Sequence, residues 1–453
     1  MKYLIGFFHS FYSQLSSWSK ARGFYLKSTV FTNFNQSIST QFLLVSLNFC
    51  IVILQPLTSN AQDQLTEYLT IAAKNNPRLQ ALSKEYLASL EEIPQAGALP
   101  DPQLTLATFL LPVETRVGAQ RASVAVSQML PWFGTLNAQE QVAAERAKIK
   151  LCQLEDARRD LFKQVKITYN ELYYLQAATK ITRENLTILG SFKELARVNF
   201  EGAQTGFTDV LRAEIEEEAL RNKLQYLEES YEPLVKQFEQ LLNQNLTKPL
   251  SLPDSIGTEE LLITKDSVFQ VILANNPQLE ALRHEVQAYQ GQVNVAHKIG
   301  FPSFTIGGSY VNIAPRTDTE VPDNGRDAVL FPQVGIRLPV YRKKYDALET
   351  QAQLQREATL LREESRQDQL RTQVENLYRD YRDAQRRVVM NRRLVDLARR
   401  TLSLLQTEFT TGEADFEEVI QIERQLLDYQ LQLERAKVER NNYVYQVHYL
   451  MGK

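Results

Sequence analysis

Residues 370–411 read LRTQVENLYRDYRDAQRRVVMNRRLVDLARRTLSLLQTEFTT, and they give the clearest indication of the fold. It ends a run from Val340 to Thr411 that holds neither glycine nor proline. Apolar or small side chains recur in steps of four and three between Leu370 and Phe409, which is the spacing of a coiled-coil seam. A helix over the whole run would reach roughly 100 Å, which no ordinary globular core needs. The stretch therefore predicts a long helix packed lengthwise against another helix.

The expected seam contains one clearly polar residue, Asn391. Its members are Leu370, Val374, Leu377, Tyr381, Ala384, Val388, Asn391, Val395, Ala398, Leu402, Leu405 and Phe409. After a short turn at Phe409–Phe416, the same spacing returns in Val419, Ile422, Leu426, Tyr429, Leu433 and Ala436. A second long hairpin is expected around the breaker-free run Thr135–Leu189, with its turn at Phe200–Phe207. The glycines of both turns predict the left-handed backbone that ends many helices.

The chain contains an internal repeat. Residues 75–82 read NNPRLQAL and residues 275–282 read NNPQLEAL, so six of eight positions agree at an offset of 200. Repeats of this kind indicate duplicated structural units. We expect a first repeat at 62–245 and a second at 264–453. Residues 246–263, with two prolines and a glycine, are expected to link them.

Each repeat is expected to hold one helix, then two strands, then a long helical hairpin. The strand candidates are Gln103–Leu111, Arg121–Leu130, Ser303–Ala314 and Phe331–Val340. Their lengths are close to the 9–11 residues or so that a tilted membrane strand needs. The apolar alternation in each is weak, so a small soluble sheet stays an alternative.

Four strands cannot close a barrel in a membrane, because such barrels start at eight strands and open edges are not tolerated in lipid. Several copies of the chain would have to contribute strands. Three copies would supply twelve. The fold class expected is therefore mainly α with a membrane β-barrel: long helical hairpins and four strands per chain in duplicated halves, with several copies closing the barrel.

Residues 1–61 have the pattern of an export signal. They contain four basic and no acidic side chains, and the apolar run Phe42–Leu54 precedes small residues ending at Ala61. A basic region, a short apolar core and small residues before the cut are typical of a secretory leader. We expect cleavage after Ala61. Only Cys152 would then remain, so no disulfide within the chain is expected.

Composition argues against several function classes. The net charge is −3, whereas nucleic-acid binding requires a basic face. His284, His297 and His448 form no pair at the spacing of metal ligands, so no metal site is expected. We find no nucleophile beside a base and no glycine-rich phosphate loop, so neither a cofactor nor an enzymatic reaction is expected.

The doubled Asn-Asn-Pro motif and the Leu-Pro pairs that end the strand regions combine with two Phe-x-x-Gly/Ala turns followed by Asp-Val or Glu-Val. This ordered set resembles the TolC-type outer membrane efflux protein family over residues 64–452. The resemblance implies a homotrimer with a 12-stranded barrel in the outer membrane lipid of a Gram-negative bacterium, and a long helical barrel that extends into the periplasm. It also implies two partners: a periplasmic adaptor protein that docks on the helical tips, and an inner-membrane pump such as an RND transporter.

The resemblance assigns roles to residues of both turns. Adaptor docking is expected at Phe200, Gly202, Ala203, Gly206, Phe207, Phe409, Gly412 and Phe416. The pore is expected to narrow at Glu418, with Asp209 and Asp415. Three copies of Glu418 on the axis would attract cations. The alternative for Glu418 is a solvent-exposed position at the start of a helix, where the helix dipole favours acidic residues. Ala203 stands where the family usually has glycine.

The function expected is a passive exit channel of a tripartite efflux system. A periplasmic coiled-coil scaffold without a pore is the alternative from a different class. A duct for type I protein secretion is the alternative within transport. The scaffold would explain the seams but not the four strand candidates.

Overall fold

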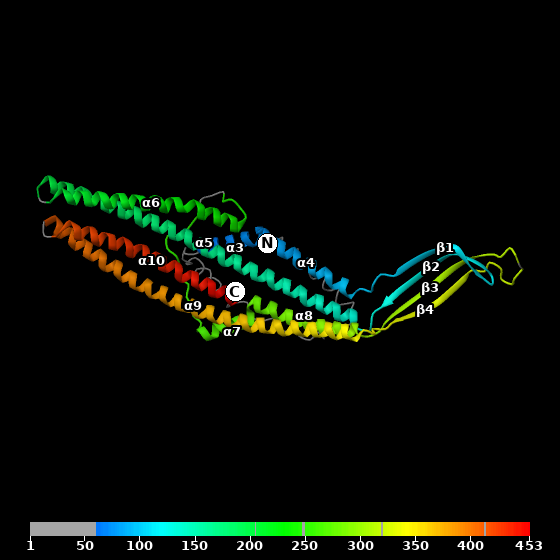
Figure 1. Ribbon diagram of the computed structural model, residues 1–453. Helices are drawn as coiled ribbons and strands as arrows, with labels where there is room; N and C mark the ends of the chain where they lie inside the picture. Colours follow the sequence, from blue (N-terminus) through cyan, green and yellow to red (C-terminus); the bar gives the residue numbers. More distant parts are fainter. Residues whose placement is uncertain (1–59, 204, 247–249, 319, 412–413) are drawn as a thin grey trace, which may run out of the picture. The chain divides into compact units, whose positions relative to one another are not determined.

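Long antiparallel helices lead into a four-stranded sheet (Figure 1). The computed structural model describes residues 60–453 except 204, 247–249, 319 and 412–413, and Asn60–Lys453 forms one compact unit. The expected leader, 1–61, lies outside the described residues except for its last two. No helix in the described part of the chain is long and apolar enough to cross a membrane.

Two shorter helices precede the strands of each repeat, where the sequence predicted one. They are α3 Asn60–Asn75, α4 Pro77–Gly97, α7 Lys265–Asn275 and α8 Pro277–Ile299. The break falls inside the Asn-Asn-Pro motif. Asn76 is extended, with ψ 118°, because a following proline disfavours helical backbone, and its side chain accepts a hydrogen bond from the N–H of Leu79. Asn276 caps α8 in the same way, so the motif is a helix start.

The two long hairpins are confirmed. They consist of α5 Thr135–Glu201 with α6 Phe207–Leu242, and of α9 Arg342–Thr411 with α10 Phe416–Leu450. The 67 residues of α5 correspond to about 100 Å of helix. Gly190 lies within α5 without breaking it.

The predicted seam of α9 is its packed face. All members are buried except Leu405, which is partly buried against the same core. Asn391 is 1% exposed, and its side-chain amide has no hydrogen-bond partner among the described residues. The apolar core near the turns contains residues from α5, α6, α9 and α10, so the hairpins pack against each other as well as internally.

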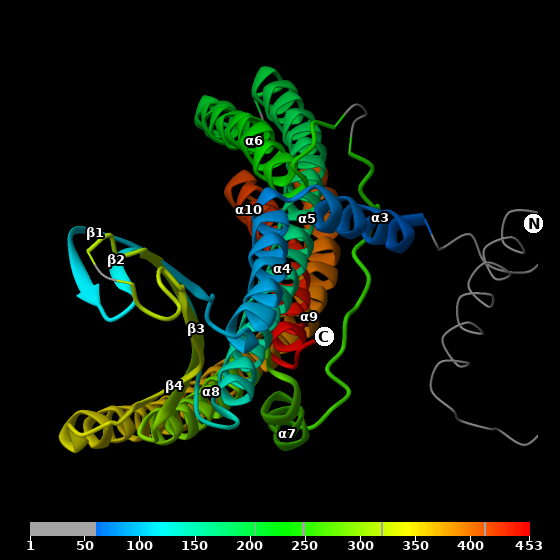
Figure 2. The same cartoon turned by 90° about the vertical axis from the view of Figure 1, so that its right-hand side faces the viewer.

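The strands form one antiparallel sheet in the order β1-β2-β3-β4, and Figure 2 shows it curving rather than lying flat. Their bounds are β1 Gln103–Thr115, β2 Gly118–Leu130, β3 Ser303–Ala314 and β4 Ala328–Arg337. The prediction for β3 is confirmed. The prediction of Phe331–Val340 for the fourth strand is wrong by three residues at each end.

The register explains that shift. Ala328 pairs with Val311, so β4 begins before Phe331. Arg337 pairs with Ser303, the first residue of β3. Residues 338–340 therefore have no partner strand, and Pro339 also lacks the N–H that a ladder requires.

Candidate functional site

The turn between α5 and α6 forms the first tip, defined here as residues 200–207. Ala203 has φ 56° and so adopts the left-handed conformation. Gly202 has φ −79°, and Gly206, the residue before α6, also has φ −79°. The expectation that the glycines supply the left-handed backbone is therefore wrong for this turn. Ala203 bears that cost, about 1–2 kcal/mol for a residue with a side chain.

The turn between α9 and α10 forms the second tip, defined here as residues 409–416. Gly412, expected to help dock the adaptor, lies outside the described residues. Asp415 is extended, and its side chain accepts a hydrogen bond of 3.1 Å from the N–H of Glu417. Such a cap satisfies a free N–H of the helix, so Asp415 has a local structural role.

Each tip holds a pair of phenylalanines in nearly the same geometry. The rings of Phe200 and Phe207 have centroids 5.3 Å apart and an interplanar angle of 50°. Those of Phe409 and Phe416 are also 5.3 Å apart, at 47°. The exposure of the two pairs is opposite: Phe200 and Phe207 are 41% and 53% exposed, whereas Phe409 and Phe416 are 3% and 1% exposed.

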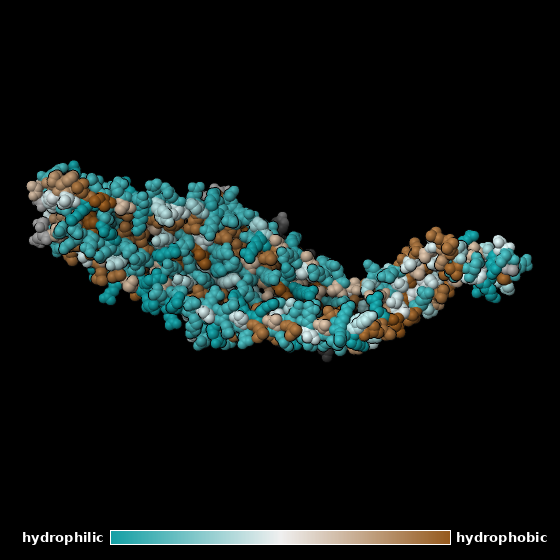
Figure 3. Space-filling view, viewed as in Figure 1, coloured by the Kyte–Doolittle hydropathy of each residue, from teal (hydrophilic) through white to brown (hydrophobic). Residues whose placement is uncertain are grey.

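The second pair is buried because it packs inside the shared core of the four long helices. The first pair has exposed apolar neighbours instead. Leu211 and Ile215 follow Phe207 in steps of four along α6, and Val198 is exposed on α5. Figure 3 shows apolar residues gathered at this end of the molecule. Exposed apolar patches on one face mark contacts with another protein or with lipid.

Charged groups connect α6 and α10 just beyond the two tips. Arg212 of α6 lies 3.6 Å from Asp209 and 3.0 Å from Glu417 of α10. Burial raises the pKa of the Asp209 carboxyl, and the negative charge of Asp415 raises it further, while Arg212 lowers it. Asp209 and Asp415, both expected at the pore constriction, therefore lie close enough to interact.

Glu418 projects from the first turn of α10 and is exposed. Its carboxylate makes no ion pair within the part of the chain that the structure describes. An exposed carboxylate without a partner is free to act on an ion or on a charged group of another chain. Its place in a pore remains a prediction.

Glu423, which was not among the residues expected to form a site, lies in the core beyond Glu418. It is 3% exposed, and its Oε1 has no hydrogen-bond partner among the described residues. Burial raises the pKa of Glu423 to about 7; the neighbouring Glu216 adds to this and Arg424 opposes it. Glu423 follows the seam residue Val419 by four positions, and that spacing is the sequence signal that could have identified it.

The sheet has one strongly apolar face. Leu106, Val124, Tyr310 and Val329 pair in a row across the four strands. Directly paired residues share a face of a sheet, and all four are at least 41% exposed. The next row, on the opposite face, is Thr105, Ala125, Ser309 and Leu330, of which only Leu330 is large and apolar. One strongly apolar face and one mainly small or polar face, on strands of 10–13 residues, fit a sheet that separates lipid from water.

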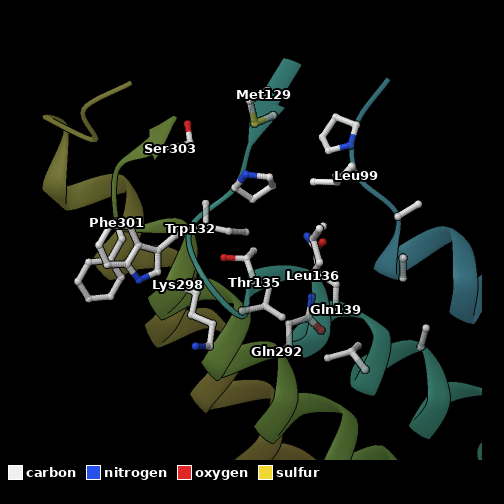
Figure 4. Close-up of a pocket in the computed structure, with 18 of the residues that line it drawn as sticks. Leu99, Met129, Trp132, Thr135, Leu136, Gln139, Gln292, Lys298, Phe301 and Ser303 are labelled. Carbon is white, nitrogen blue, oxygen red and sulfur yellow. The ribbon is translucent and has the colours of Figure 1, made fainter. Parts of the chain in front are cut away.

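A cleft of about 1040 Å³ lies where the strands join the helices (Figure 4). Trp132 stacks on Phe301 and Phe304, with ring centroids 5.0 and 6.1 Å away. Lys298 lines the same cleft. Aromatic side chains concentrate at the boundary between lipid and water, so this cluster fits the edge of a membrane segment.

Comparison with known proteins identifies the class. The family model of the outer membrane efflux protein matches residues 69–244 and 268–453, and the chain belongs to that family. The protein is an outer-membrane efflux channel, the exit component of a tripartite pump, and it extends into the periplasm. This result excludes the scaffold without a pore.

Solved structures share the fold. The outer-membrane channel OprN is 18% identical with a TM-score of 0.74, and the match covers 86% of this chain and 89% of that one. The outer membrane protein VceC from Vibrio cholerae is 17% identical with a TM-score of 0.72, covering 87% and 97%. CusC is 14% identical with a TM-score of 0.73, covering 86% and 92%. A search of curated proteins gave no match.

Proposed function

We propose that the protein acts as a homotrimer in which twelve strands close a barrel in the outer membrane. The observation that carries this proposal is the sheet with one apolar face and two unpaired edges, β1 and β4. Unpaired backbone N–H and C=O groups cost several kcal/mol each in lipid. Pairing β1 of one copy with β4 of the next removes both edges.

The first tip is the proposed main docking surface for a periplasmic adaptor protein, which would connect the channel to an inner-membrane pump such as an RND transporter. The exposed pair Phe200 and Phe207 supports this role, since aromatic anchors concentrate binding energy at interfaces. Adaptor docking would move the hairpins and widen a ring of Glu418 on the threefold axis. Glu418, Asp209 and Asp415 would narrow the resting pore.

The proposed mechanism is passive conduction. The energy for transport would come from the inner-membrane pump, and the channel itself would catalyse no reaction. Residues 1–61 would act as a signal removed on export, followed by the repeats 62–245 and 264–453 joined by 246–263. Sequencing of the mature N-terminus tests the cleavage site after Ala61.

Native mass spectrometry of the detergent-extracted protein tests the trimer. We expect a mass of three mature chains. A monomer that stays soluble without detergent would contradict the shared barrel.

A matched pair of variants tests the orientation of the sheet. Leu106→Arg places a charge on the apolar face and should reduce membrane assembly, because arginine facing lipid costs about 2–4 kcal/mol. The neighbouring Thr105→Arg places the same charge on the opposite face and should assemble normally. Equal assembly of both variants would contradict a lipid-facing row.

A further inference from the structure

A second chemical cluster lies between α5 and α8, far along α5 from the tips. One donor atom from each of Cys152, Glu280 and His284 lies within 4.8 Å of the other two. Nε2 of His284 is 4.0 Å from Oε1 of Glu280, one turn earlier on α8. Nδ1 of the same ring is 2.7 Å from Oε2 of Glu145 on α5.

We propose that this cluster is a binding site for a divalent transition-metal ion of the zinc type. Sγ of Cys152, Nε2 of His284 and a carboxylate oxygen of Glu280 are the ligands. Water occupies the fourth position. Glu145 is a positioning residue that holds the histidine ring.

The donor set selects the ion. Sulfur, imidazole nitrogen and carboxylate oxygen together suit Zn²⁺, whereas Mg²⁺ and Ca²⁺ take oxygen ligands. Bond lengths of about 2.0–2.3 Å place tetrahedral ligands about 3.4–3.8 Å apart. The present separations, at most 4.8 Å, exceed that by no more than about 1.4 Å, a distance that side-chain rotations cover.

The ring of His284 is already oriented to bind a metal ion through Nε2. Metal-bound histidines commonly donate their second ring N–H to a carboxylate, which fixes the tautomer and the ring plane. Glu145 provides that carboxylate, because its contact to Nδ1 leaves Nε2 facing Glu280. Lys148, 2.7 Å from the other oxygen of Glu145, balances the negative charge of the Glu145 carboxylate.

Access and charge are both consistent with binding. Cys152 is 6% exposed, but Glu280 is exposed and gives the ion an entry from solvent. Binding of M²⁺ releases the thiol proton of Cys152 to solvent and forms the metal–thiolate bond. Thiolate and Glu280 carboxylate then balance the two positive charges.

The ion would join the two halves of the chain. Cys152 and Glu145 belong to the first repeat, whereas Glu280 and His284 belong to the second. No metal site was expected from the sequence, because its histidines form no pair at the spacing of metal ligands. The Glu280–His284 spacing of four residues was the available signal.

Titration of the purified, detergent-extracted protein with Co²⁺ tests the site. Tetrahedral Co²⁺ bound to a thiolate absorbs in the visible and gives a charge-transfer band in the near ultraviolet. We expect one Co²⁺ per chain, displaced by Zn²⁺. Cys152→Ser should abolish the charge-transfer band, His284→Ala should weaken binding more than tenfold, and Glu145→Gln should weaken it 10–100-fold.

His297→Ala is the matched control. His297 lies on the same helix and faces Glu349 at 3.7 Å, outside the cluster, so its loss should leave Co²⁺ binding unchanged. Far-ultraviolet circular dichroism and native mass confirm that each variant is folded. The absence of a thiolate band in the wild-type protein, or equal affinity in the wild type and His284→Ala, would overturn the proposal.

Discussion

The two tips have the same ring geometry but opposite environments. Phe200 and Phe207 face solvent, whereas Phe409 and Phe416 lie within the core of the long helices. Duplication thus produced two similar turns, of which one anchors the bundle and the other presents an apolar surface. Residues that occupy matching positions in the two repeats therefore differ in role.

The largest difference is expected in stability. Phe416→Ala should lower the free energy of unfolding by about 3–5 kcal/mol, because it empties a buried site. Phe207→Ala, at a largely exposed site, should change it by about 0.5 kcal/mol. Denaturant unfolding of the purified channel measures both. Equal losses would show that the environments of the two tips do not differ as described.

Glu423 sharpens the comparison, because it lies in the core that buries the second tip. Its pKa is raised from an ordinary value of 4.5 to about 7, so the folded protein retains a proton that the unfolded chain releases. Stability should therefore fall as pH rises from 4.5 to 7 and stay low above that. Over this pH range the free energy of unfolding should fall by about 3 kcal/mol in total.

Glu423→Gln should remove this loss and stabilise the protein at pH 8. Thermal unfolding followed between pH 4.5 and 8 measures the effect. Glu218→Gln, at an exposed position of α6, is the control and should leave the pH profile unchanged. A Glu423→Gln profile that matches the wild type would contradict the raised pKa.

The backbone of the first tip offers a smaller test. Ala203→Gly should stabilise the protein by about 1 kcal/mol, since glycine adopts the left-handed conformation without strain. Gly202→Ala is the reverse exchange at the neighbouring residue, where the backbone suits alanine, and should not destabilise. Unfolding midpoints measure both. Destabilisation by Ala203→Gly would contradict the backbone strain described at Ala203.

The ion pair between α6 and α10, just beyond the tips, should have the smallest effect on stability. Arg212 and Glu417 are 46% and 64% exposed, so their coupling should be about 0.5 kcal/mol. A double-mutant cycle with Arg212→Ala and Glu417→Gln measures it. The coupling should vanish at 1 M salt. A coupling above 2 kcal/mol that survives salt would mean that the pair is desolvated in the assembled channel.

Much of the fold could be predicted because periodicity reports which face of a helix is buried. The seam from Leu370 to Phe409 follows from its steps of four and three, and β3 follows from its composition. The position of β4 could not be predicted, because its ends are set by pairing with Ser303 and Val311. The register of a strand depends on its partner strand as well as on its own sequence.

The site was predictable only in part. Both phenylalanine pairs are visible in the sequence, but their opposite exposure depends on which hairpin face meets the other hairpin. Glu423 resembles any helical carboxylate until its neighbours are known. Cys152 and His284 are far apart in the chain, so only the packing of α5 against α8 brings them together.

Site-specific photo-crosslinking in the native host tests the central claim that the exposed tip is the docking surface. A photoreactive phenylalanine analogue would replace Phe207 in one strain and Phe416 in another, and mass spectrometry would identify the products. We expect position 207 to capture a periplasmic adaptor protein and position 416 to crosslink only within its own chain. Capture of only another copy of this chain at position 207 would contradict the claim and assign the exposed pair to contacts between copies.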